Sequence, residues 1–120
     1  MKLIEFFFQL SNVVKLYHWK TGSYARHKAS DSLFGKIIDI SDKFMEVYFG
    51  KYGKNSIKTL AYTSELLDDD KIIDYLNGCI VFLNDIVKNK LIKAIDTDLL
   101  NIRDELLAEI NQTLYLFTLK

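Results

Sequence analysis

The chain has no proline, one cysteine and two histidines, and its 16 basic residues are balanced by 16 acidic ones. The absence of proline favours long helices, because proline breaks a helix interior. The absence of net charge leaves no overall field to attract nucleic acid or a membrane. No segment approaches the roughly 18 uninterrupted apolar residues of a membrane span. The N-terminal apolar run carries no signal-peptide cleavage site. These absences predict a cytoplasmic protein.

The length predicts a single domain over residues 1–120, long enough to bury about two thirds of its unfolded surface. Its one cysteine, Cys79, lies in the apolar run CIVFL. A single cysteine cannot form an intrachain disulfide, so we expect a reducing compartment. We interpret Cys79 as a small core residue rather than a nucleophile, because neither histidine lies near it in the sequence.

Apolar residues recur every three or four positions along four segments, and this period predicts helices. The segments cover residues 3–20, 26–49, 65–90 and 98–120. Gly50 is the predicted stop of the second helix and Thr97 the predicted N-cap of the last. A short first loop and a long middle connection predict an all-α, ferritin-like four-helix bundle with helices two and three parallel. A plain up-down-up-down bundle is the alternative.

Both histidines flank the first turn, which brings His18 and His27 to one end of the bundle, level with Asp31. Asp42 and Glu46 follow on the same side of the second helix, in an arc that also holds large apolar residues. We therefore expect these acids to lie off the solvated face, where an unpaired charge is costly. A bound divalent metal, iron, manganese or zinc, would neutralise them. Pairing with Lys or Arg of another helix is the alternative.

The spacing along the second helix limits how such a metal can be held. Asp42 and Glu46 lie 11 and 15 residues beyond Asp31, or about 16 and 22 Å at 1.5 Å per residue. One ion cannot reach both groups within a chain. A twofold dimer with antiparallel second helices would bring them together. The sequence also lacks the Glu-x-x-His pairs of an intrachain di-iron centre, so it predicts a shared site or no site.

The segments HW (18–19), HKASD (27–31) and DKFME (42–46) follow one another in an order that resembles the ferroxidase signature of the Dps miniferritins. In that family the iron site is shared between two subunits. The resemblance implies iron ligands from both: His18, His27 and Asp31 from one subunit, Asp42 and Glu46 from the other. It thus implies the same dimer by which the spacing allows one metal to reach both groups.

The same resemblance implies a catalytic role for Trp19, as an oxidisable ring beside the site together with Tyr17 or Tyr24. Fe²⁺ would be oxidised there by peroxide or dioxygen, and the ferric product stored in a shell of twelve subunits. Many members use a basic N-terminal extension on DNA, but only Lys2 precedes the first helix here. Nucleic-acid binding is therefore not implied.

The segments HWKTGSYARHKA and VYFGKYG are also similar to a group of small ferritin-like proteins of phages and large DNA viruses. That resemblance implies an alternative function, a structural or interaction protein with a vestigial or static metal site. Either protein would work in the cytoplasm of a bacterium or of an infected host cell. The hypotheses differ in what the metal does, because the first predicts redox turnover and the second does not.

Overall fold

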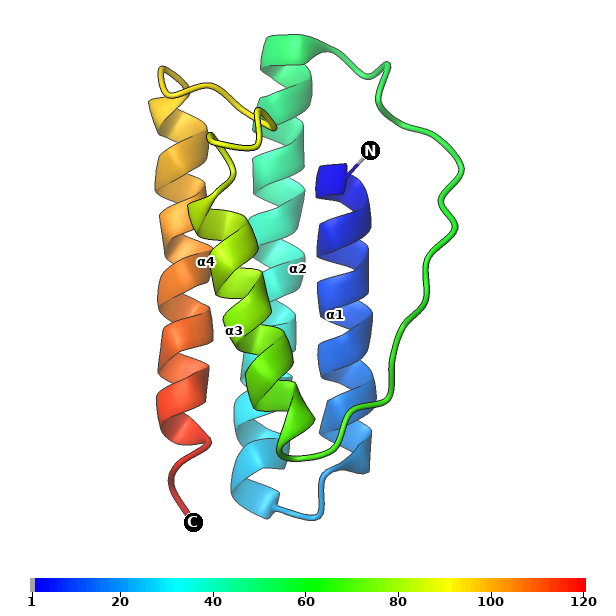
Figure 1. Cartoon of the computed structure of the whole chain (residues 1–120), viewed down its shortest axis with the longest axis vertical. Helices are drawn as coiled ribbons and strands as arrows, with labels where there is room; N and C mark the ends of the chain where they lie inside the picture. Colours follow the sequence, from blue (N-terminus) through cyan, green and yellow to red (C-terminus); the bar gives the residue numbers. More distant parts are fainter. Residues whose placement is uncertain (1) are drawn as a thin grey trace.

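The computed structural model describes residues 2–120 and folds them into four helices. They are α1 (Lys2–Lys20), α2 (Tyr24–Tyr52), α3 (Lys71–Asn84) and α4 (Thr97–Leu116). In Figure 1, α1 and α4 run downward while α2 and α3 run upward. The predicted all-α bundle with parallel second and third helices is confirmed, and the alternating topology is excluded.

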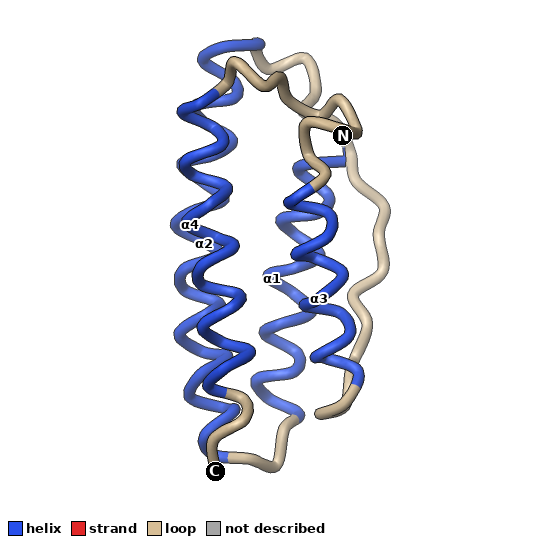
Figure 2. The backbone as a smooth tube through the Cα atoms, turned by 60° about the vertical axis from the view of Figure 1, so that its left-hand side comes forward, coloured by secondary structure: helices blue, strands red, loops and turns tan. Residues whose placement is uncertain are grey.

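Residues 53–70 form the crossover, an extended segment that returns the chain from the end of α2 to the start of α3 (Figures 1 and 2). α2 has 29 residues, so it is about 43 Å long. The crossover has fewer residues than α2, so it can span that length only as extended chain, at about 3.3 Å per residue. The crossover runs beside α1, where Gln9 Nε2 donates to Thr63 O and Asn12 Nδ2 to Tyr62 Oη, each at 2.9 Å. It is therefore fastened to the bundle by side chains of α1.

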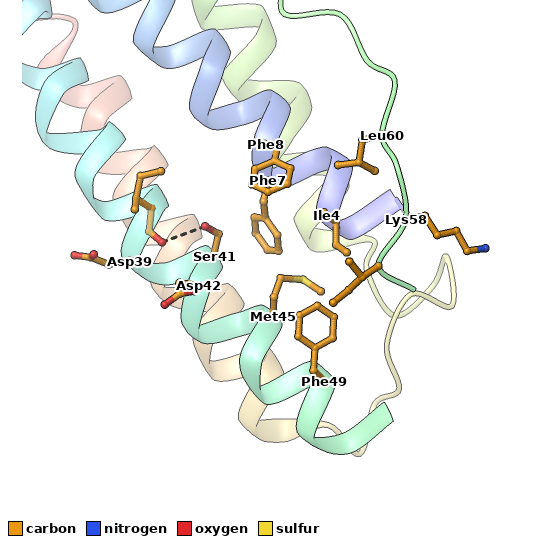
Figure 3. A pocket seen from close by; sticks show the side chains of 12 residues that line it. Ile4, Phe7, Phe8, Asp39, Ser41, Asp42, Met45, Phe49, Lys58 and Leu60 are labelled. Atoms are coloured by element: carbon orange, nitrogen blue, oxygen red, sulfur yellow. Dashed lines mark hydrogen bonds between the residues drawn. The ribbon is translucent and has the colours of Figure 1, made fainter. Parts of the chain in front are cut away.

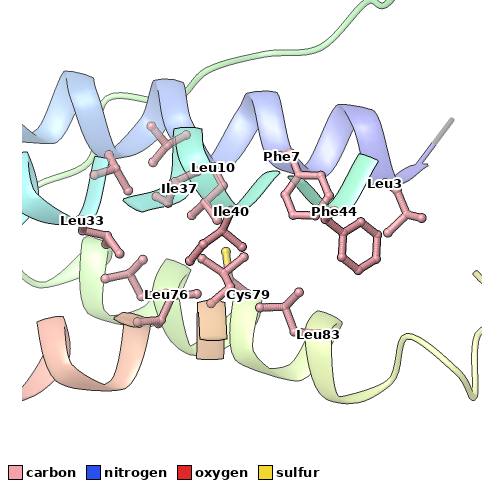
Figure 4. Close-up of a cluster of buried hydrophobic side chains, with 14 of the residues drawn as sticks. Leu3, Phe7, Leu10, Leu33, Ile37, Ile40, Phe44, Leu76, Cys79 and Leu83 are labelled. Carbon is pink, nitrogen blue, oxygen red and sulfur yellow. The ribbon is translucent and has the colours of Figure 1, made fainter. Parts of the chain in front are cut away.

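The core lies between the inner faces of all four helices (Figure 4). Leu10, Phe44, Leu76 and Leu106 represent α1 to α4 there, and each is at most 1% exposed. Each such side chain stabilises the fold by about 1.5–3 kcal/mol through burial. Cys79 is buried among them, as predicted, and burial raises the pKa of its thiol to about 12. The thiol is therefore a core group and no nucleophile.

The ends of α2 differ from the prediction by a few residues. The helix begins at Tyr24 because the Ser23 side chain caps it, its Oγ accepting the N–H of Arg26 at 3.2 Å. The prediction that Gly50 ends the helix is wrong. The chain continues to Tyr52, and Gly53, with φ of 83°, donates its N–H to Phe49 O at 2.8 Å. Only the second glycine adopts the left-handed backbone that terminates a helix.

The prediction of a helix over 65–90 is too long at both ends, because α3 covers Lys71–Asn84. At its start, Asp68 Oδ1 accepts the N–H of Lys71 at 2.8 Å, which satisfies a donor that has no partner within the helix. At its end the chain enters turns that reach Lys90, where φ is 60°. The apolar period continues beyond the end of the helix because Ile86, in the turn, is also fully buried.

α4 also differs slightly from the prediction. Thr97 is its first helical residue rather than its N-cap, and the helix ends at Leu116 before the C-terminus. None of the helices within residues 2–120 combines the length and apolar character needed to cross a membrane.

An upper junction, made of Lys51, Tyr52 and Asp96, ties the end of α2 to the loop before α4. Asp96 is 1% exposed and accepts hydrogen bonds from Tyr52 Oη at 2.6 Å and from the N–H of Lys93 at 2.8 Å. Lys51 Nζ lies 3.0 Å from its other oxygen. The Tyr52 hydrogen bond, with these partners, lowers the pKa of Asp96 to about 2. The carboxylate is thus held charged inside the protein.

A lower junction, made of Tyr17, Arg26 and Asp69, ties the α1–α2 turn to the end of the crossover. Asp69 Oδ1 accepts from Tyr17 Oη at 2.7 Å and from Thr21 Oγ1 at 3.0 Å. Arg26 donates to Tyr17 Oη at 3.1 Å and to the Asp69 carbonyl at 2.8 Å. The Tyr17 hydrogen bond lowers the pKa of Asp69, and burial raises that of Tyr17. This junction holds the end of the hairpin that carries the histidines.

Candidate functional site

The two histidines stack on each other across the α1–α2 turn. Their ring centroids are 3.8 Å apart and their planes differ by 17°. His18 Nδ1 lies 2.7 Å from His27 O, and His27 Nδ1 lies 2.8 Å from His18 O. Because a carbonyl oxygen only accepts, each Nδ1 must carry a proton and donate it. In its neutral form each imidazole therefore has its lone pair on Nε2.

This reciprocal pair of hydrogen bonds has a structural role of its own. His18 O belongs to the last turn of α1, where carbonyls have no partner within the helix. The His27 ring donates to this carbonyl, and the His18 ring donates in turn to the carbonyl of His27 in the first turn of α2. The pair thus fastens the hairpin, which explains why both imidazoles of the chain lie so close together.

Asp31 lies at the same end of the bundle, as the sequence predicts. Its Oδ1 is 3.8 Å from His18 Nε2 and 3.7 Å from Lys15 Nζ. The His18 side chain is 9% exposed, whereas that of Asp31 is 58% exposed. One carboxylate oxygen is therefore shared between an imidazole and an ammonium group at the surface.

Asp42 and Glu46 are exposed, and the prediction that the acids of α2 lie off the solvated face is wrong. Asp42 lines an apolar groove together with Met45 and Phe49, as the helical period suggests, yet both acids remain exposed. Among residues 2–120, no three side chains of His, Cys, Asp or Glu gather closely enough to hold a metal ion. The donors are of types that suit a metal, but one chain presents them as two separated parts.

The aromatic residues near the histidines have different environments. Trp19 is 68% exposed, and Lys15 Nζ lies 5.6 Å from its ring centroid. Tyr24 is 73% exposed, with its ring 6.4 Å from that of His27. Tyr17 is fully buried and bonded to Asp69, so its place is in the lower junction.

An apolar groove, which the sequence analysis missed, lies between α1, the second half of α2 and the crossover (Figure 3). Its volume is about 460 Å³, within the range of ligand pockets. Its lining includes Ile4, Phe8, Ile38, Met45, Phe49, Ile57 and Leu60, with Asp39, Asp42 and Lys58 among its polar members. The signal in the sequence is the arc of α2 in which large apolar residues stand beside Asp42 and Glu46.

Comparison with known proteins gives a family and one distant relative. The uncharacterized 14.6 kDa protein in the mobD-ri intergenic region of Enterobacteria phage T4 is 39% identical over 66 residues. The match covers 51% of this chain and 52% of the phage protein, so the chain spans about half the length of that relative. This similarity agrees with the resemblance to phage proteins noted in the sequence.

No solved structure matches the chain. The resemblance to the miniferritins therefore rests on the spacing of residues between 18 and 46 alone. The model of the family of unknown function DUF5856 matches residues 18–117, which include the end of α1 and all of α2, α3 and α4. Because this match covers most of its length, the chain belongs to DUF5856.

Proposed function

We propose that this protein is a Dps-like iron-binding protein that oxidises Fe²⁺ with peroxide or dioxygen at two sites shared across a twofold dimer. Each site takes ligands from both subunits: His18, His27 and Asp31 from one, Asp42 and Glu46 from the other. The ferric product is stored in a larger shell, for which twelve subunits is the expected number.

The orientation of the two imidazoles is the observation that carries this proposal. Metal-binding histidines usually donate one ring N–H to a carbonyl or carboxylate, which fixes the tautomer and presents the other nitrogen to the metal. His18 and His27 both do this through Nδ1, at 2.7 and 2.8 Å. The carboxylate of Asp31 lies beside His18 Nε2. Imidazole nitrogen with carboxylate oxygen is a donor set that suits iron, zinc and manganese.

The register of α2 supports the sharing of ligands between subunits. Ile38 lies on the outer face and is 46% exposed. If two copies of α2 cross antiparallel at Ile38, Asp31, seven residues before it, comes level with Met45 of the partner, seven residues after it. Asp42 and Glu46 of that partner flank Met45. One crossing thus assembles both halves of the ligand set, twice, as twofold symmetry requires.

The reaction at such a site is a transfer of electrons from iron to the oxidant. Each Fe²⁺ gives up one electron, and one peroxide molecule takes up two electrons and two protons to form two molecules of water. Tyr17 and Trp19 are the oxidisable rings adjacent to His18 along α1, and Trp19 is the exposed one of the two. Zinc or manganese suits the same donors and would bind there without this turnover.

A non-enzymatic structural or interaction protein with a static metal site is the second candidate. The histidine pair favours it, because the reciprocal hydrogen bonds explain both residues without a metal. The open apolar groove also favours it, since an exposed apolar surface of this kind marks a contact with another molecule. The phage relative suits a protein of viral origin.

Iron oxidation by the purified protein tests the proposal. Fe²⁺ is added without oxygen, then peroxide or air is admitted, and the ferric absorbance is followed. The Asp42→Ala/Glu46→Ala variant should oxidise iron at least about tenfold more slowly than the wild type, because it lacks the second half of each site. The matched control is Glu105→Ala/Glu109→Ala, with the same spacing of two acids on α4.

Fast oxidation in the wild type and in the α4 control, lost in the α2 variant, would support the shared ferroxidase site. Equal and slow oxidation in all three proteins would remove the enzymatic function and leave the structural one.

A further inference from the structure

The outer face of the α1–α2 hairpin carries an apolar groove at one end and an exposed tryptophan at the other. We propose that these two features fit each other between two copies of the chain, so that Trp19 of each subunit inserts into the groove of its partner. This contact rests on the dimer of the proposed function and adds what fills the groove. It also gives Trp19 an anchoring role that is independent of iron.

The groove is open in the single chain and has the character of a receptor for a large apolar side chain. Phe8, Ile38 and Ile57 line it and are 51%, 46% and 54% exposed. In Figure 3 the side chains of Ile4, Phe7, Met45 and Phe49 converge on one space between α1 and α2. Apolar surface gathered in this way is stabilised when another apolar group covers it.

Trp19 lies on the same face of α1 as the groove. It follows Phe8 by 11 residues, which corresponds to a rotation of only about 20° and a rise of about 16 Å. At 68% exposed, it is the only tryptophan of the chain. Tryptophan is enriched among the residues that dominate binding energy at interfaces.

The antiparallel register brings the two features together. His18 and His27 stack, so the end of α1 that carries Trp19 lies level with His27 on α2. His27 and Phe49 are each 11 residues from Ile38. When two α2 helices cross at Ile38, the Trp19 end of one hairpin therefore meets the Phe49 end of the other, where the groove lies. The same crossing fills both grooves.

The charges beside the two features are complementary. Lys15 Nζ lies 4.7 Å from the ring centroid of Phe34 and 5.6 Å from that of Trp19. Phe34 and Asp42 are each four residues from Ile38, so the crossing brings Lys15 toward Asp42 of the partner. Asp39 adds a second acid to the groove. Lys15 also offsets the charge of Asp31 as that carboxylate approaches the partner's acids.

A second copy of the chain is thus the occupant that fits best, since it supplies the apolar group, the register and the opposite charge at once. A small apolar ligand would use the groove but would leave Trp19 exposed. A partner helix from another protein would need no twofold relation between the two ends of the hairpin. Both alternatives predict that Trp19 stays in water when the chain is alone.

The fluorescence of the one tryptophan reports directly on this contact. The metal-free protein is measured over a wide range of concentration, by tryptophan emission and by sedimentation equilibrium on the same samples. We expect the emission maximum to move to shorter wavelength in step with the dimer fraction. Trp19→Ala should weaken the dimer by at least about thirtyfold in Kd, the scale of a tryptophan hot spot.

Two further variants make the test specific. Ile38→Glu places two like charges at the crossing point and should give a monomer whose Trp19 emits as in water. Tyr115→Ala removes an aromatic ring on α4 that is 63% exposed and should change neither reading. Neither Trp19 nor Ile38 belongs to the buried core, so these substitutions leave the core intact.

A dimer whose emission does not move, or a Trp19→Ala protein that dimerises like the wild type, would overturn the contact. So would a wild-type chain that stays monomeric at every concentration. A dimer with a shifted emission that fails to oxidise iron would keep this contact and remove the ferroxidase. Iron oxidation by a dimer with an unshifted emission would do the reverse.

Discussion

The upper and lower junctions each combine a tyrosine, an aspartate and a basic residue, at opposite ends of the bundle and in different surroundings. In each, a tyrosine hydroxyl donates to an aspartate, and a basic residue near one end of α2 completes the set. Asp96 of the upper junction is 1% exposed, whereas the Asp69 side chain of the lower junction is 52% exposed. Water can replace the partners of Asp69 but not those of Asp96. The upper junction should therefore contribute more to the free energy of unfolding than the lower junction.

The largest difference is expected on removing each carboxylate. Asp96→Ala leaves the Tyr52 hydroxyl and the Lys93 N–H without their acceptor, so its melting temperature should fall by about 10 °C or more. Asp69→Ala exchanges an exposed partner for water and should cost less than about 1 kcal/mol. Thermal unfolding followed by circular dichroism measures both. If both variants lost the same stability, burial of the carboxylate would not explain a difference between the two junctions.

A dependence of stability on pH should follow from Asp96. Its pKa is about 2 in the folded chain, below the value of about 3.9 of an unfolded aspartate. A lowered folded pKa contributes stability above the unfolded value, and this contribution is lost as the pH falls from about 4 toward 2. Urea unfolding across this range should show the loss in the wild type. Asp96→Asn should be less stable than the wild type above about pH 4, should approach it near pH 2, and should lack this part of the slope. A parallel pH profile in the variant would assign the loss to other carboxylates.

The smallest expected difference is between the two tyrosines. Tyr17→Phe removes a hydroxyl from an aspartate that water also reaches and should cost about 1 kcal/mol. Tyr52→Phe removes the donor of a buried carboxylate and should cost more, although its ring is more exposed. The midpoints of urea unfolding give the order. Tyr17→Phe as the more damaging change would reverse the comparison.

The sequence was sufficient for the number of helices, because the apolar period depends only on local pattern. The loop lengths favoured parallel second and third helices but left the alternating bundle open, and only the structure decided between them. The ends were less predictable. Ile86 continues the apolar period of α3 beyond Asn84, since a buried turn needs apolar residues as much as a helix does. The choice of Gly53 over Gly50 as the terminator depends on which glycine has positive φ, which composition does not reveal.

At the candidate site, the meeting of His18, His27 and Asp31 was predictable, because a short turn must bring the ends of two helices together. The exposure of Asp42 and Glu46 was not, since a helical angle gives the direction of a side chain but not what covers it. The exchange of Nδ1 bonds between the histidines also escaped prediction, as it depends on the backbone of the turn. The metal ligands and their partner remain predictions.

The crossover has a consequence for how the chain can be divided. It is the covalent link between two helical hairpins, α1 with α2 and α3 with α4, and hydrogen bonds from Gln9 and Asn12 hold it at the surface. A protease cut within residues 57–61 would leave both hairpins whole and every helix of the core in place. Folding would then become the association of two peptides, with a stability that depends on their concentration. The α1–α2 and α3–α4 hairpins can thus be regarded as two complementary fragments that the crossover joins into one chain.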